Sequence, residues 1–360
     1  MTTKKLIVLT AAAAVLAGLA YFSNASKKMK TPALVGKPVL PSVDLSDVQR
    51  VEIGPSGTKK LVLESADNGW CIKTLFGYPA DIAKIRENLL KLKDLKIGHV
   101  ATGKKLNAPT LVDLQNANGK SLATLRLGPK HMRASSGGED AMGGGGGYPD
   151  GRYVSAAGAD TVFLVKETLE SFDGDPKSWL DTQIATVPAA DMTSIEIAKN
   201  GQTAKLTKVN GTWALDSLAA KEEFDTSKSY GVESALNYLN FNSVADPALT
   251  EAQLGMSTGT VFSVSLKNGE HYTAWVGAAV TNSTDRYFKI KGSFTPAGTN
   301  ATENATLTKK IDAFNAKVGK WTFTIPSYTA ENMTKSHADF VKAKEEPKKD
   351  DSKKNETQTK

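Results

Sequence analysis

Five Asn-Gly pairs limit the fold of this chain more than any other feature of its sequence. They lie between runs in which apolar and polar residues alternate, at Asn68-Gly69, Asn118-Gly119, Asn200-Gly201, Asn210-Gly211 and Asn268-Gly269. An Asn-Gly pair favours the left-handed backbone of a type I′ turn, which joins two antiparallel strands. The sequence therefore predicts a body that is rich in β-hairpins.

The predicted elements of the first half occur in a recognisable order. A strand at Val48 to Ile53 precedes a hairpin that ends at Trp70, and a helix is expected from about Pro79 to Leu95. Strands flank Asn118-Gly119, and another begins at Arg152-Tyr153. The helix is predicted because four apolar residues recur at helical spacing: Ile82, Ile85, Leu89 and Leu92.

The second half repeats this order about 144 residues later. Ile195-Glu-Ile197 matches Val51-Glu-Ile53, and a second tryptophan, Trp213, follows an Asn-Gly turn. Helices are expected from about Asp225 to Leu239 and from about Thr308 to Val318. Because the period is so long, we interpret the repeat as a duplicated domain and not as a solenoid. Arg286-Tyr287 in the second half matches Arg152-Tyr153 in the first.

These patterns predict an α+β fold: two tandem repeats of a mainly antiparallel sheet with one principal helix each, after an N-terminal membrane helix. The expected organisation is a membrane anchor or signal segment (1–25), a linker (26–46), a first α+β repeat (47–187), a second α+β repeat (188–333) and a disordered charged tail (334–360).

The N-terminal segment Leu6 to Phe22 contains 17 uncharged residues after Lys4 and Lys5. This length is long for a cleaved signal peptide and slightly short for a membrane span. We favour an uncleaved single-pass anchor with the body exported. The alternative is cleavage at Ser23-Asn24-Ala25, which would release the protein.

Most of the basic charge lies outside the predicted folded body. The chain has 45 basic and 38 acidic residues, a formal net charge of +7, but residues 31–334 carry 32 of each sign. A nucleic-acid-binding face needs lysines and arginines concentrated on folded surface, so we expect no nucleic-acid partner.

The sequence shows no catalytic or metal-binding motif. It has one cysteine and four histidines, and it lacks H-E-x-x-H, G-x-S-x-G and the phosphate-binding glycine motifs. The glycine-rich loop 134–147 leads into a strand and not a helix, so we interpret it as a long connection. We therefore expect no enzymatic activity, no cofactor and no metal. An unrecognised hydrolase remains a third hypothesis.

Three aromatic residues could stack on a sugar ring if the protein binds glycans: Tyr272, Trp275 and Tyr287. They lie in or near the strands that follow Asn268-Gly269, and strand-rich surfaces with tryptophan and tyrosine can bind such ligands.

The chain resembles a bacterial family of unknown function whose members have a short N-terminal membrane segment and a duplicated β-rich domain. The resemblance covers most of residues 1–330. It involves LAGLAYF (16–22), VQRVEI (48–53), NGWCIK (68–73), PADIAKIRENLLKLKDLKI (79–97), NGKSLATLRLG (118–128), GRYVSA (151–156) and TVFLV (161–165). The glycine-rich insertion and the charged tail depart from the family pattern.

The resemblance implies an auxiliary role in gliding-motility-type ABC transport systems and supplies no catalytic residues. Together with the predicted anchor, it leads us to expect a non-enzymatic protein of the bacterial inner membrane with its body in the periplasm. Its expected partners are an ABC transporter or other envelope proteins. The alternative is a periplasmic glycan- or peptide-binding module.

Overall fold

The computed structural model describes residues 34–40, 42–67, 69–133, 147–296 and 298–344. The predicted membrane segment, nearly all of the glycine-rich loop and the tail after residue 344 lie outside these residues. Among the helices of the described part, none is long and apolar enough to cross a membrane. The chain divides into two units, Met1–Leu180 and Asp181–Lys360. The sequence analysis placed this boundary between residues 187 and 188.

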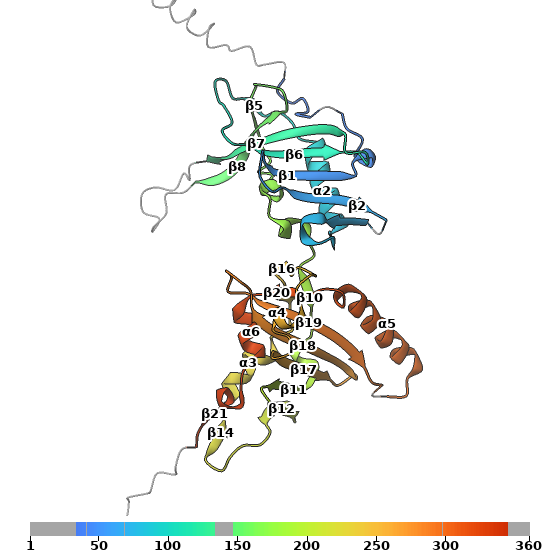
Figure 1. Cartoon of the computed structure of the whole chain (residues 1–360), viewed down its shortest axis with the longest axis vertical. Helices are drawn as coiled ribbons and strands as arrows, with labels where there is room; N and C mark the ends of the chain where they lie inside the picture. Colours follow the sequence, from blue (N-terminus) through green and yellow to red (C-terminus); the bar gives the residue numbers. More distant parts are fainter. Residues whose placement is uncertain (1–33, 41, 68, 134–146, 297, 345–360) are drawn as a thin grey trace, which may run out of the picture. The chain divides into compact units, whose positions relative to one another are not determined.

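The first unit is built on an antiparallel sheet (Figure 1). Within the described residues it has nine strands in the order β4-β3-β2-β1-β6-β7-β8-β9-β5. Their bounds are β1 Arg50–Pro55, β2 Leu61–Ala66, β3 Gly69–Ile72, β4 Tyr78–Pro79, β5 His99–Val100, β6 Thr110–Gln115, β7 Ser121–Arg133, β8 Tyr148–Ala156 and β9 Phe163–Val165. Short 3-10 helices span Leu45–Asp47, Lys73–Leu75, Glu170–Asp173 and Pro176–Trp179.

Alternation along β1 shows how this sheet separates its two faces. Val51 and Ile53 are fully buried. Arg50 and Glu52 lie on the other face, where Arg50 forms ion pairs with Glu52 at 2.9 Å and with Glu64 at 2.8 Å. Successive side chains of a strand point to opposite faces, so one face packs on the core and the other is polar.

Helix α2 (Ile82–Lys93) covers the apolar face of the first sheet (Figure 1). It begins at Asp81, whose carboxylate accepts hydrogen bonds from the backbone N–H groups of Ala83 and Lys84 at 2.8 and 3.3 Å. Its apolar residues Ile85, Leu89 and Leu92 are buried, and burial of each stabilises the fold by about 1.5–3 kcal/mol. The structure thus confirms the sheet-rich α+β class that the sequence predicted.

The second unit repeats the central strand order of the first. In the described part its main sheet has eight antiparallel strands, β13-β12-β11-β17-β18-β19-β20-β16. The bounds are β11 Met192–Lys199, β12 Gln202–Val209, β13 Thr212–Leu215, β16 Ser243–Val244, β17 Thr260–Leu266, β18 Glu270–Ala279, β19 Arg286–Phe294 and β20 Phe323–Ile325. Two small strand pairs join β10 (Gln183–Ala185) to β15 (Leu239–Asn240) and β14 (Glu222–Phe224) to β21 (Val341–Ala343).

The same arginine contact occurs in each of the two sheets. Arg152 donates from Nε to the carbonyl of Gly128 at 2.9 Å, and Arg286 donates from Nε to that of Gly277 at 2.9 Å. Both glycines lie where the pairing with the following strand shifts in register. The two Arg-Tyr pairs that matched in the sequence therefore occupy equivalent positions.

Four of the five Asn-Gly pairs lie wholly within the described residues, whereas Asn68 lies outside them, and these four use two kinds of turn. In Asn200-Gly201 and Asn210-Gly211 both residues have positive φ, between 50° and 83°. This backbone is the one that a type I′ turn requires. At Asn118-Gly119 and Asn268-Gly269 only the glycine has positive φ. All four pairs join antiparallel neighbours, so the predicted hairpins form even where the expected turn type does not.

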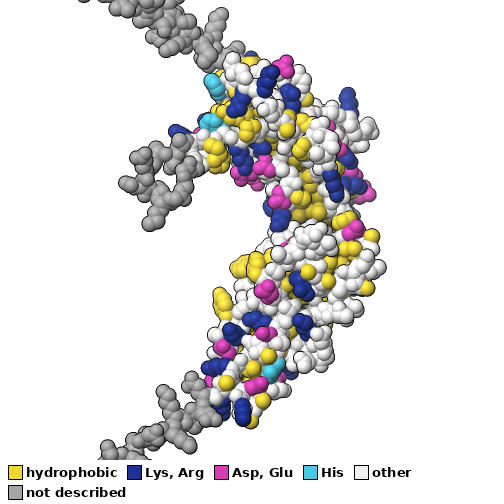
Figure 2. Space-filling model, turned by 60° about the vertical axis from the view of Figure 1, so that its left-hand side comes forward, with side chains coloured by type: hydrophobic (Ala, Val, Ile, Leu, Met, Phe, Trp, Pro, Cys, Tyr) yellow, Lys and Arg dark blue, Asp and Glu magenta, His cyan; other side chains and the backbone are white. Residues whose placement is uncertain are grey.

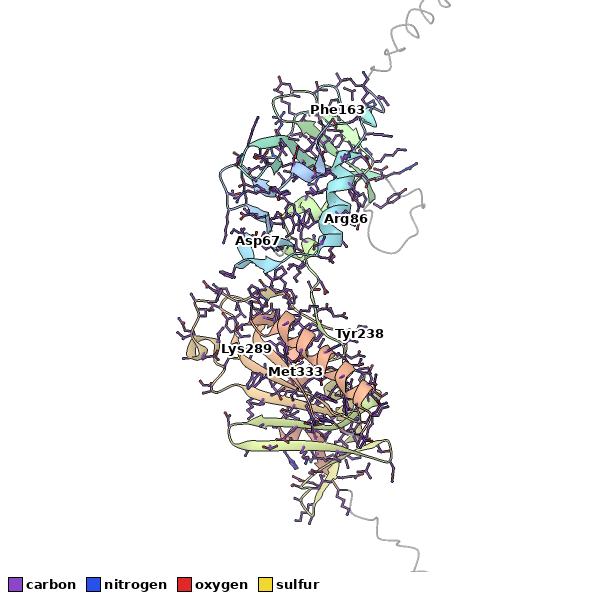
Figure 3. All side chains as sticks on the ribbon, turned by 90° about the vertical axis from the view of Figure 1, so that its right-hand side faces the viewer. Asp67, Arg86, Phe163, Tyr238, Lys289 and Met333 are labelled. Atoms are coloured by element: carbon purple, nitrogen blue, oxygen red, sulfur yellow. The ribbon has the colours of Figure 1, made fainter. Side chains whose placement is uncertain are left out.

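The principal helix of the second unit is not the one expected at Asp225 to Leu239. That segment contains only α3 (Ser229–Glu233), preceded by a 3-10 turn at Thr226–Lys228. Gly231, which is a poor helix former, lies against Asn332, and a Cβ there would come within 2.5 Å of the Asn332 Oδ1 atom. The long helix is α5 (Ala301–Val318), which begins seven residues before the predicted start and lies across the sheet in Figure 3.

The segment after α6 (Ser327–Met333) is structured up to residue 344, where we had expected a disordered tail from residue 334. His337–Phe340 forms a 3-10 helix, Phe340 is fully buried, and Val341–Ala343 pairs with β14. The buried aromatic ring explains the difference, because its burial offsets part of the entropy lost on ordering this segment.

Candidate functional site

The four histidines have separate environments. His99 is exposed in β5. His131 contacts Asp150 at 2.5 Å, His271 contacts Ser265 at 3.0 Å, and His337 contacts Glu222 at 3.1 Å. Among the described residues, none of these histidines belongs to a hydrogen-bonded series of hydroxyl, imidazole and carboxylate, which is the arrangement of a hydrolase triad. No group of three or more potential metal ligands comes together in that part of the chain either.

The structure does not bring the three predicted stacking aromatics together on an open surface. Tyr272 is buried below α5, where its ring meets Phe314 edge-on at 5.3 Å. Trp275 is partly buried and packs with Tyr287 in a small apolar cluster near α4 (Glu251–Leu254). Tyr272 and Trp275 lie on opposite faces of β18, because they are three positions apart along the strand.

Glu270 is the most buried charged residue of the second unit. It is fully buried and accepts hydrogen bonds from Lys310, Tyr272 and Asn268. The two Lys310 contacts measure 2.7 and 2.9 Å. Burial alone would raise the pKa of Glu270, but the hydrogen bonds, that of Lys310 foremost, outweigh this effect and hold the pKa below its usual value.

This cluster is suited to holding α5 on β18 and not to acid–base chemistry. Burial, followed by the hydrogen bond to Glu270, raises the pKa of Tyr272 well above its usual value. A general acid or base works best with a pKa near the working pH. Here the pKa of the Glu270 carboxyl is lowered and that of the Tyr272 phenol is raised, so both move away from pH 7.

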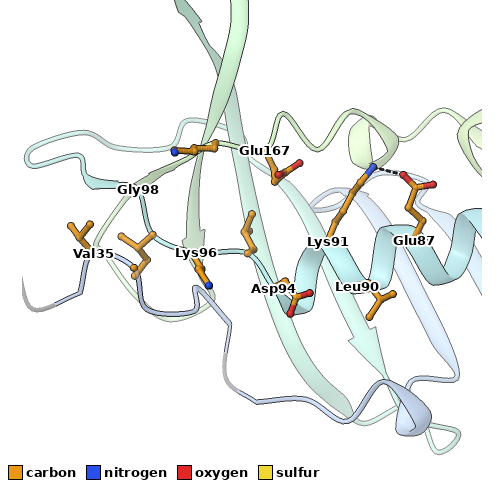
Figure 4. Close-up of a pocket in the computed structure, with 12 residues that line it drawn as sticks. Val35, Glu87, Leu90, Lys91, Asp94, Lys96, Gly98 and Glu167 are labelled. Atoms are coloured by element: carbon orange, nitrogen blue, oxygen red, sulfur yellow. Dashed lines mark hydrogen bonds and ion pairs between the residues drawn. The ribbon is translucent and has the colours of Figure 1, made fainter.

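The first unit contains an apolar cleft with a volume of about 780 Å³ (Figure 4). We call it the α2 cleft. Figure 4 shows Leu90 and Asp94 entering it from α2, Val35 from the N-terminal segment, and Glu167 from the loop after β9. Leu90 is 42% exposed and Val35 is 40% exposed, so both present apolar surface to the cleft.

Backbone pairing with the segment after α2 builds one wall of the α2 cleft. Gly36 donates to the carbonyl of Ile97 at 2.8 Å, and Ile97 donates to that of Lys37 at 2.9 Å. On the other side Gly98 donates to Leu164 of β9 at 3.0 Å. These bonds anchor residues 34–40, which the sequence analysis assigned to an extended linker.

The rim of the α2 cleft carries balanced charge. Its three lysines and three acidic residues are Lys91, Lys96, Lys166, Glu87, Asp94 and Glu167. Of the lysines, Lys91 is paired with Glu87 at 2.6 Å. An apolar floor with a neutral rim fits an apolar peptide segment better than an anionic ligand.

Sequence reasoning missed the α2 cleft, although one signal was present. Leu90 is apolar but lies outside the spacing of Ile85, Leu89 and Leu92 that marks the buried face of α2, and it is exposed. The residues that complete the cleft come from segments before and after the helix. Their approach depends on tertiary pairing.

Comparison with known proteins identifies the family of the chain. A family model described as "Domain of unknown function (DUF4340)" matches residues 70–257, slightly more than half of the chain. No curated protein and no solved structure matches. The match begins within the first unit and ends within the second. The chain therefore belongs to the DUF4340 family, a family of unknown function.

Proposed function

We propose that this chain is a non-enzymatic, membrane-anchored protein of the bacterial cell envelope that binds a membrane-protein partner through the α2 cleft. The observation that carries the proposal is the position of this apolar cleft, which is lined by Val35 and Gly36. These residues lie 13 and 14 positions after Phe22, the last residue of the predicted anchor.

An anchor that ends at Phe22 keeps the α2 cleft close to the membrane in this proposal. The residues between Phe22 and Leu34 span at most about 40 Å when fully extended. A single-pass anchor in the inner membrane, with the body in the periplasm, therefore keeps the cleft within reach of the periplasmic part of a membrane protein. If the N-terminal segment is instead cleaved as a signal, the protein is periplasmic and this constraint disappears.

The occupant that fits the α2 cleft is an apolar peptide segment of the partner. Leu90 and Val35 provide exposed apolar surface, and the rim carries equal numbers of positive and negative side chains. Exposed apolar patches of this kind are typical of protein-binding sites. We propose that the partner belongs to an ABC-type transport system, for which the protein is an accessory. Nucleic acid is not among its proposed partners.

Site-specific photocrosslinking from the α2 cleft tests this function. A benzophenone amino acid at Leu90 is expected to crosslink the permease or another membrane subunit of an ABC-type system. The same group at Val209, which is 54% exposed on β12 of the second unit, is the matched control and should give no such product.

A charged substitution gives the second half of the test. Leu90→Asp should abolish the crosslink from Val35 and copurification of the subunit, with little effect on folding because Leu90 is exposed. Equal crosslinking from Val209, or products containing only other classes of protein, would contradict the proposal.

A glycan- or peptide-binding module is the second candidate function. The aromatics first expected to carry it do not form an open surface, since Tyr272 is buried and Tyr287 nearly so. A different group of tyrosines in the second unit favours it.

A further inference from the structure

The second unit contains a cleft that is lined by tyrosine and amide side chains and carries no charged residue. It has a volume of about 350 Å³. One wall is the turn between α3 and β15, and the other is the start of α6. The residues that matter for the argument are Asn237, Tyr238, Asn240, Tyr328, Thr329 and Asn332. We call this the tyrosine–asparagine cleft.

Two tyrosines of the cleft are exposed to solvent. Tyr238 is 67% and Tyr328 71% accessible to solvent. Figure 2 shows hydrophobic side chains, a class that includes tyrosine, protruding from the surface of this unit. Figure 3 labels Tyr238, which directly precedes β15, the strand that pairs with β10. Exposed aromatic rings cost hydration free energy, and a ligand that stacks on them removes this cost.

The backbone at Tyr238 is strained. Its φ is +53°, in the left-handed region that residues with a Cβ rarely adopt. Such strain is maintained only when the surrounding structure fixes it, and it concentrates at binding sites. Asn240 helps to hold this backbone conformation, because its Nδ2 atom donates a hydrogen bond to the carbonyl of Tyr238 at 2.7 Å.

The amide groups of the cleft supply both hydrogen-bond donors and acceptors. Asn240 is oriented by Thr182, whose hydroxyl donates to its Oδ1 atom at 3.1 Å. Among the described residues, the side chains of Asn237 and Asn332 have no hydrogen-bond partner. A carboxamide presents two donor hydrogens and an acceptor oxygen, which match hydroxyl groups that also donate and accept.

The absence of lysine, arginine, aspartate and glutamate from the lining residues restricts the ligand further. A phosphorylated, sulfated or carboxylated ligand would lack a counter-charge in the cleft. The volume lies near the lower end of the range of about 300–1,000 Å³ found for small-molecule sites. One or two uncharged rings would fill it.

We propose that the tyrosine–asparagine cleft binds a neutral saccharide, one or two sugar rings within a longer glycan. The faces of Tyr238 and Tyr328 stack on the C–H faces of the rings, and the asparagine amides bind the ring hydroxyls. A proline-rich peptide fits less well because its backbone offers chiefly carbonyl acceptors. This inference is independent of the α2 cleft, which belongs to the other unit.

Binding of neutral disaccharides to the full-length, detergent-solubilised chain tests the proposal. Cellobiose, maltose, lactose and diacetylchitobiose are measured by saturation-transfer NMR and calorimetric titration. We expect at least one to bind with a Kd of about 1 mM or lower. Tyr328→Ala and Tyr238→Gly should each weaken that binding at least about tenfold.

The choice of glycine at position 238 keeps the test free of folding effects. Glycine adopts positive φ without strain, so Tyr238→Gly removes the ring while the thermal midpoint stays the same or rises. Tyr230→Ala is the matched control, because Tyr230 is 75% exposed in the same unit but does not line the cleft. This variant should bind as the wild type does.

Three results would overturn the proposal. The first is a folded wild-type chain that binds none of the four disaccharides. The second is saccharide binding that Tyr238→Gly and Tyr328→Ala leave unchanged. The third is tight binding of a proline-rich peptide that both variants abolish while no disaccharide competes, since this would assign the cleft to peptides. None of these results bears on crosslinking from Leu90.

Discussion

The ion pair between Lys310 on α5 and Glu270 on β18 allows a quantitative test of how the second unit is held together. Lys310→Met removes the ammonium group but keeps most of the apolar stem. Glu270, which is fully buried, then retains only the hydrogen bonds from Tyr272 and Asn268. A buried carboxylate without a cation is costly, so the variant should be less stable than the wild type.

The structure sets the size of this effect between two limits. Breaking a fully buried pair costs about 3–5 kcal/mol, and breaking an exposed pair costs about 0–1 kcal/mol. Glu270 is buried, but the Lys310 side chain is 58% exposed, so solvent screens part of the interaction. We expect a loss of about 2 kcal/mol in the free energy of unfolding. For a unit of this size, that loss lowers the thermal midpoint by about 4–8 °C.

The effect should depend on pH in a defined direction. Because the folded-state pKa of Glu270 lies below its usual value, its carboxylate stabilises the wild type above about pH 4. This contribution is lost as the pH falls through the folded-state pKa. In Lys310→Met the hydrogen bond from Lys310 no longer offsets the effect of burial, so the folded-state pKa of Glu270 rises. The deficit of the variant should therefore be largest at pH 7 and shrink toward pH 4.

Differential scanning calorimetry of the full-length chain at pH 7, 5.5 and 4 measures both quantities. Lys309→Met is the matched control, because Lys309 is the exposed neighbour on α5 and has no ion pair among the described residues. Its midpoint should stay within about 1–2 °C of the wild type. The reasoning fails if Lys310→Met is no less stable than Lys309→Met, or if its deficit is the same at all three pH values.

Two further predictions concern the first unit. Arg152→Met should destabilise this unit by about 3 kcal/mol in the same calorimetric assay, since the buried guanidinium bonds Asp173 and the carbonyls of Gly128 and Leu169. Arg152→Lys should restore less than half of the lost stability, because an ammonium lacks the planar fork of a guanidinium. Burial raises the pKa of the Cys71 thiol, so its reaction with a disulfide reagent should be slower in the native chain than in urea and keep accelerating above pH 9; equal rates would contradict this.

Local sequence patterns predicted the strands well because their causes are local. The four Asn-Gly pairs that lie wholly in the described residues all join antiparallel neighbours, although only Asn200 and Asn210 adopt the left-handed backbone of the expected turn type. The alternation of Val51 and Ile53 with charged residues identifies the buried face of β1 without knowledge of its neighbours. The helical spacing of Ile82, Ile85, Leu89 and Leu92 likewise predicted α2.

The helices of the second unit show where local patterns stop being sufficient. Residues 225–239 have apolar residues at helical spacing, yet the helix covers only Ser229–Glu233. The chain then turns, with Tyr238 at positive φ, into β15, which pairs with β10. Phe340 gave no helical or strand signal in a charged segment, but a pocket in the second unit buries it completely. Both outcomes depend on partners distant in sequence.

The sequence by itself determined a hairpin-rich chain with two similar halves, a balanced charge in the body and a single cysteine. These properties follow from turn chemistry, side-chain alternation and composition, which act within a few residues. Only the tertiary structure decided which aromatic residues are exposed. It buries Tyr272 under α5 and leaves Tyr238 and Tyr328 in solvent. A tyrosine has the same chemistry in each place, and its exposure depends on which distant element packs against it.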